Sequence, residues 1–200
     1  MREWDKIFYS DCKKAKEILG KKSTGVYENS MFTLLLRLTV FTVVLVHCGS
    51  SFLYAETFLG QNDQWEAFSN KEAGKMVCYI GSEPIEMRGK YKKRGTSYAM
   101  VTHRPSEKSL NVVSIKAGYK HKVDSKVKVI IGNLHFKLFT QDGWAFAHDS
   151  KADNALVKAM KQGAEMLVKG ISSRGTTTTD RYSLKGFTAA YRSIGRACKL

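Results

Sequence analysis

The chain has 200 residues, 43% of them hydrophobic, and a formal net charge of +15 at pH 7. This is enough apolar material for one ordinary domain with a core. The net positive charge favours polyanionic binding partners, unless the charge is spread evenly over the surface and serves only to keep the protein soluble. The four cysteines show no CxxC spacing, so neither a redox motif nor a zinc knuckle is predicted.

Residues 31–55 form an apolar stretch with one charge, Arg37. The uninterrupted part, residues 38–46, has the length of the hydrophobic region of a signal peptide, whereas a bilayer span needs about 20 apolar residues. We therefore expect residues 31–55 to be a signal peptide that is cleaved after Ala55. An uncleaved signal anchor is the alternative, and it would be the chain's one contact with a membrane.

Residues 1–30 are a polar, lysine-containing leader that is longer than the usual start of a signal peptide. Met31 stands at the first position of the apolar stretch. Our hypothesis is that translation begins at Met31 and that residues 1–30 are not translated. A lipoprotein signal at Cys48 is disfavoured, because His47 precedes it where a small residue is required.

The remaining segment, residues 56–200, is expected to be a single domain. It holds 25 Lys and Arg against 13 Asp and Glu, a net charge of +12. Cys78 and Cys198 are its only cysteines. In an oxidising compartment we expect them to form a disulfide that closes a loop of about 120 residues and stabilises the fold by about 2–4 kcal/mol.

Alternating apolar and polar residues predict a series of strands in this domain. The predicted strands cover residues 75–80, 97–103, 111–117, 126–131, 134–140, 143–148, 165–171 and 180–184. Residues 56–74 are polar, with Trp65 and Phe68 as anchors into the core. Gly132-Asn133 predicts a two-residue hairpin turn.

After residue 150 the spacing of the apolar residues changes from that of a strand to that of a helix in two segments, which predicts two short helices. Residues 154–162 are predicted to form a helix that Asp153 caps and Gly163 ends. Residues 186–198 carry apolar side chains at helical spacing, with Cys198 on the inward face. The fold class predicted is mainly β, a β-sandwich or closed antiparallel sheet of about seven or eight strands with two short helices, the last at the C-terminus.

The histidines of the domain show no metal-ligand spacing. They are His103, His121, His135 and His148. We expect His103 at a solvated strand end. A triad of Ser172 or Ser173 with His103 and Asp180 is disfavoured, because no GxSxG elbow accompanies it. We therefore predict no catalytic residue, no metal ligand and no cofactor.

A basic run is the best candidate for an interaction site. Its cations are Arg88, Lys90, Lys92, Lys93 and Arg94, with one aromatic residue, Tyr91, among them. Such a cluster binds polyanions, although a solvated loop is the slightly preferred reading. Nucleic acid is not expected as a partner, because an exported protein seldom meets it.

Three segments resemble the invasion-associated locus B family of alphaproteobacterial exported proteins. They are residues 102–119 (THRPSEKSLNVVSIKAGY), 142–146 (DGWAF) and 168–198 (VKGISSRGTTTTDRYSLKGFTAAYRSIGRAC). The resemblance covers about residues 63–198. It implies a mainly-β, signal-peptide-bearing protein of the periplasm or the outside of the cell, linked in pathogenic members to entry into host cells. It supplies no catalytic residues.

Within the matching segment, Gly175 is expected in a backbone conformation open mainly to glycine. Arg174 is expected to pair with a carboxylate such as that of Asp180, rather than to face a ligand.

The function predicted is that of a non-enzymatic envelope protein supporting envelope function or host-cell interaction, periplasmic or secreted. Its expected partners are anionic components of the envelope or host surface, and its oligomeric state is not predicted. One alternative is a polyanion-binding module that uses the basic run to hold an anionic glycan or lipid. Another is an accessory periplasmic hydrolase.

Overall fold

The computed structural model describes residues 56–200, which contain eleven strands, two α-helices and a short 3-10 helix, η1 (Pro105–Glu107). The strands are β1 (Thr57–Asn62), β2 (Trp65–Glu72), β3 (Lys75–Ser82), β4 (Glu86–Gly89), β5 (Tyr98–Arg104), β6 (Ser109–Lys116), β7 (Lys126–Ile131), β8 (Leu134–Gln141), β9 (Trp144–Phe146), β10 (Glu165–Ile171) and β11 (Thr177–Ser183). The α-helices are α3 (Ser150–Gln162) and α4 (Phe187–Ala197). The predictions for residues 1–55 lie outside the described part of the chain.

All eleven strands belong to one sheet, in the order β1-β2-β3-β5-β6-β9-β8-β7-β10-β11-β4. Every pairing between neighbours is antiparallel. Within the described residues, β1 and β4 are edges that do not pair with each other, so the sheet is open. The prediction of a mainly-β fold with two helices is confirmed, but a sandwich or closed sheet of seven or eight strands is wrong.

Three strands account for the difference in number. The hairpin of β1 and β2 occupies the segment that was predicted only to be polar. Its buried positions, all on β2, are Trp65, Ala67 and Ser69, too few and too mixed to show an apolar alternation. Trp65 is fully buried, as predicted, whereas Phe68 is only half-buried and stacks on Tyr79 on the outer face. β4 is four residues long and lies within a basic segment, which hides it from pattern analysis.

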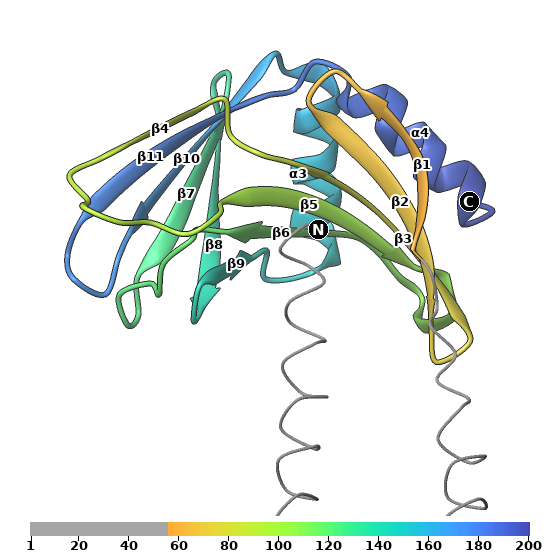
Figure 1. Ribbon diagram of the computed structural model, residues 1–200, viewed down its shortest axis with the longest axis horizontal. Coiled ribbons are helices and arrows are strands. Elements are labelled where there is room, and N and C mark those ends of the chain that lie inside the picture. The colour runs from red at the N-terminus through yellow and green to blue at the C-terminus, as the bar shows by residue number, and fades with distance from the viewer. Residues whose placement is uncertain (1–55) are drawn as a thin grey trace, which may run out of the picture. The chain divides into compact units, whose positions relative to one another are not determined.

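The chain crosses the sheet twice around β4. It leaves β3, pairs with β11 at the opposite edge as β4, and returns to β5, which lies beside β3 (Figure 1). The returning link, residues 90–97, is tied to the segment after β6 by a hydrogen bond from Gly95 N to Gly118 O at 2.9 Å. This crossing brings a basic stretch of chain against the inner face of β11.

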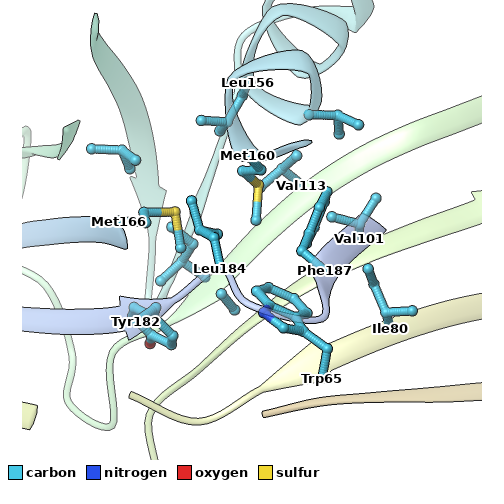
Figure 2. Packing of buried hydrophobic residues seen from close by; sticks show 14 of the residues in the cluster. Trp65, Ile80, Val101, Val113, Leu156, Met160, Met166, Tyr182, Leu184 and Phe187 are labelled. Atoms are coloured by element: carbon cyan, nitrogen blue, oxygen red, sulfur yellow. The ribbon is translucent and has the colours of Figure 1, made fainter. Parts of the chain in front are cut away.

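Inward residues at every second position of the strands make one core beneath the helices (Figure 2). Trp65 lies edge-on to Phe187 of α4, with ring centroids 4.8 Å apart, and its Nε1 donates to Ser183 O at 2.9 Å. Leu156 and Met160 of α3 point into the same core. Each fully buried side chain of this size stabilises the fold by about 1.5–3 kcal/mol.

The start of α3 differs from the prediction. Asp149, not Asp153, is the capping residue, and its Oδ1 accepts a hydrogen bond from Ala152 N at 2.7 Å. Asp153 is buried instead, and its Oδ1 accepts from Val113 N of β6 at 2.9 Å. It therefore anchors the helix to the sheet. Gly163 ends the helix, as predicted.

α4 packs over β1, β2 and β3 and ends beside Cys198. No helix among residues 56–200 is long and apolar enough to cross a membrane.

Candidate functional site

The basic run that the sequence singles out is divided by the fold. Arg88 lies on β4, and its Nε donates to Glu86 Oε1 at 2.5 Å. The lysines of the run, Lys90, Lys92 and Lys93, are exposed in the link that follows. Arg94 turns inward, and only 3% of its side chain is exposed. It is therefore a structural residue, and three lysines and Arg88 remain for a ligand at this loop.

Arg94 and Asp180 form a buried, bidentate ion pair. Nη1 donates to Oδ1 at 2.6 Å and Nη2 to Oδ2 at 2.5 Å, with each side chain 3% exposed. Nε donates to Ala117 O at 2.7 Å. Burial alone would lower the pKa of Arg94, but the hydrogen bonds and negative charge of Asp180 raise it above its ordinary value. The guanidinium thus stays charged and joins β11, the β4–β5 link and the segment after β6.

Ser97 completes the hydrogen bonding around the carboxylate. Its hydroxyl lies 3.2 Å from Asp180 Oδ2, 2.9 Å from Lys116 O and 3.1 Å from the hydroxyl of Tyr182. Burial raises the pKa of Tyr182 well above its ordinary value, so this phenol is a neutral hydrogen-bonding group. Every polar atom of the pair therefore has partners, as buried charges require.

Aromatic rings close the cluster on the side of the guanidinium. The Arg94 Cζ lies 5.0 Å from the ring centroid of Tyr119 and 5.5 Å from that of Tyr91. The Tyr119 hydroxyl lies 2.6 Å from Thr178 Oγ1. The cluster is therefore a polar part of the protein interior, enclosed by aromatic rings.

The predicted pairing of Arg174 with Asp180 is wrong, because Arg94 occupies that carboxylate. Arg174 is exposed in the turn between β10 and β11. Gly175 in the same turn has a φ of 81°, so its predicted conformation is confirmed. Nothing local links Arg94 to Asp180, which are 86 positions apart, so sequence patterns gave no signal for the pair.

His103 is buried, not at a solvated strand end as predicted. It is 1% exposed, its Nδ1 accepts from Asn111 N at 3.1 Å, and its ring lies edge-on to Tyr191. Burial, and then the charge of Lys161, lower its pKa. The strand end was misjudged because the return of the chain through α4 covers it.

His121 is also buried, at 4% exposure, and lies edge-on to Tyr119. Burial lowers its pKa. His135 and His148 are exposed. Within residues 56–200, no three His, Cys, Asp or Glu side chains gather as a metal site would require.

The residues of the disfavoured triad have separate partners. Asp180 is held by Arg94, His103 by Asn111, and the hydroxyl of Ser172 accepts from Thr176 N at 3.1 Å. Ser173 is exposed in the same turn as Arg174. In the described part of the chain these side chains thus form no nucleophile–base–carboxylate series.

The disulfide is the covalent feature of the domain. Cys78 of β3 and Cys198 after α4 are bonded, with Cα atoms 6.0 Å apart and a sequence separation of 120. Cys78 is fully buried and Cys198 is 6% exposed. The predicted pairing is confirmed, and it fastens the C-terminal helix to the sheet.

Comparison with known proteins gives a relationship over most of this domain. The model of the family described as "Invasion associated locus B (IalB) protein" matches residues 65–195. The search of the curated proteins found no match.

A solved structure shares the fold. It is the crystal structure of invasion associated protein B from Bartonella henselae, with a TM-score of 0.51 and 12% sequence identity. The match covers 72% of this chain and 97% of that chain. Because the family model spans more than half of the sequence, this chain belongs to the invasion-associated locus B family.

Proposed function

We propose that this chain is an exported, non-enzymatic protein of the bacterial cell envelope that supports envelope function or contact with host cells. The observation that carries the proposal is the buried disulfide between Cys78 and Cys198. Such a bond persists in the periplasm or outside the cell and is rare in a reducing cytosol. The apolar segment 31–55, read as an export signal, supplies the route.

A non-enzymatic role rests on what the best-placed polar groups do. Arg94, Asp180 and His103 hold β11, the β4–β5 link and β6 together through hydrogen bonds to one another and to the backbone. The polar side-chain atoms of Arg94 and Asp180 all have internal partners, so these two residues stabilise the fold and have no free hydrogen-bonding atom for a substrate. Nε2 of His103 has no hydrogen-bond partner, but it is closed off from solvent. The rival, an accessory hydrolase, would require one of them to leave these partners.

The relation to host contact comes from the family and from the Bartonella henselae protein, whose description links it to invasion. In this chain the role is carried by a basic domain that is presented outside the cytoplasm and held by its own disulfide.

Cell fractionation of the full chain with a C-terminal tag tests export. We expect the protein in the periplasm or medium, with both cysteines unreactive to alkylation until a reductant is added. A matched variant with Val43→Arg and Val44→Arg breaks the apolar segment, and it should stay in the cytoplasm with reactive thiols. A wild-type chain found in the cytoplasm with free thiols would contradict the proposal.

A further inference from the structure

The outer face of the sheet carries a line of lysines that sequence analysis did not detect. In the strand register, Lys137 of β8 lies opposite Lys128 of β7, and Lys128 lies opposite Lys169 of β10. We call these three residues the lysine row. All three are exposed and alternate with buried residues of the same strands, so they share the face opposite the core.

The lysine row continues to the edge of the sheet. Lys169 pairs with Thr179 of β11, and Thr179 pairs with Arg88 of β4. Strands lie about 4.8 Å apart, so the lysines span about 10 Å and the line to Arg88 about 19 Å. The strands concerned lie side by side in Figure 1.

The lysine row is unfavourable for folding. Like charges directly opposite each other on neighbouring strands repel, and Lys128 has one on each side. Among the described residues, no ion pair involves Lys128, Lys137 or Lys169, although exposed pairs occur elsewhere on the domain. A sheet that breaks a local rule in this way commonly does so at a functional site.

The positive charge is concentrated along one register line of the sheet. On one side the next register line holds His135, Ile130 and Leu167, and then Arg181, which donates to Glu86 and Glu165. The one Lys or Arg side chain among these four residues is therefore already paired with carboxylates. On the other side the adjacent line holds half-buried Phe139 and one further exposed lysine, Lys126, on the same face of β7 as Lys128.

We infer that the lysine row binds a linear sulfated polysaccharide lying across β8, β7 and β10. A line of cations matches a linear polyanion better than a bilayer, which is a plane and favours protruding apolar groups; Ile130, Leu167 and Phe139 are only half exposed. Lysine ammonium groups act as compact point charges without a planar fork, so they favour the glycan of higher negative charge density, a sulfated one over one that carries carboxylates alone. The choice of a glycan over nucleic acid rests on the proposed export.

Binding of a heparin oligosaccharide to the purified, disulfide-bonded protein tests this inference, with calorimetry at several salt concentrations. The triple variant K128Q/K137Q/K169Q should bind about tenfold more weakly and with a smaller salt dependence. The matched control K90Q/K92Q/K93Q removes the same charge from the loop and should stay within about twofold of the wild type. An equal loss in both variants, or no loss in the first, would overturn the inference.

Other probes decide the class of ligand. Polygalacturonate, vesicles containing phosphatidylglycerol and single-stranded DNA should each bind more weakly than heparin at equal salt. Tighter binding of any of them would overturn the assignment. The first variant should melt at the same or a higher temperature than wild type, because it relieves repulsion. Binding without export would refute the proposed function alone, and export without binding would refute this inference alone.

Discussion

Replacing Asp180 by Asn isolates the contribution of the buried ion pair to stability. The change preserves the shape of the side chain and removes its charge, leaving the Arg94 guanidinium, 3% exposed, without a counter-ion. Removing one partner of a buried pair costs about 3–5 kcal/mol, because the remaining charge is uncompensated. We expect the free energy of unfolding to fall by that amount.

Urea unfolding followed by tryptophan fluorescence, with the disulfide intact, measures this loss. The control is Glu72→Gln, which breaks the Arg104–Glu72 pair, whose side chains are 33% and 50% exposed. Solvent screens that pair, so its loss should cost below about 1 kcal/mol. The double variant Arg94→Met with Asp180→Leu should recover much of the loss. A cost for Asp180→Asn no larger than that for Glu72→Gln would refute the reasoning.

Three further outcomes follow from the structure. The double variant Cys78→Ser with Cys198→Ser should lose about 2–5 kcal/mol of unfolding free energy in urea, and an unchanged midpoint would contradict the bond's role. Gly118→Ala should lower the melting temperature sharply, because the φ of Gly118 is +71° and a Cβ there would lie 2.2 Å from Gly95 O. The control Gly132→Ala should lower it less, because a Cβ at Gly132 (φ +55°) has no atom within 4 Å and meets only backbone strain. His103 and His121 have folded pKa values below 6.5, so the unfolded chain binds more protons and stability should fall as pH drops below about 6.5 and stay level above it. Urea midpoints at pH 7.5 and 5.5 test this, and His121→Gln should lessen the difference; equal midpoints for the wild type would contradict it.

Local patterns predicted the interior strands well. β7 and β10 have the predicted ends; Lys and Val alternate through the first four residues of β7, and in β10 buried Met166 and Val168 alternate with more exposed neighbours. β1 and β4 were missed because they are edge strands with few inward apolar residues. The predicted number of strands and form of the sheet were therefore wrong because the missed strands lie in the segments with the weakest sequence patterns.

The polar groups were harder to predict than the strands. Either Asp149 or Asp153 suits the start of α3, and only the position of β6 decides that Asp153 faces the sheet. The partner of Asp180 comes from a link that crosses the sheet. Part of the lysine row can be predicted from the sequence, because alternation places Lys126 and Lys128 on one face. The alignment of lysines from different strands requires the strand register. Strand pairing, unlike strand position, is a long-range property of the chain.

The intact mass of the native protein, recovered from the periplasm or medium without reductant, tests the central claim most directly. We predict a chain that begins at Glu56, is unaltered by an alkylating reagent, and gains two alkyl groups after reduction. A chain that begins at Met1 and takes up alkyl groups before reduction would contradict the account of an exported domain closed by Cys78 and Cys198.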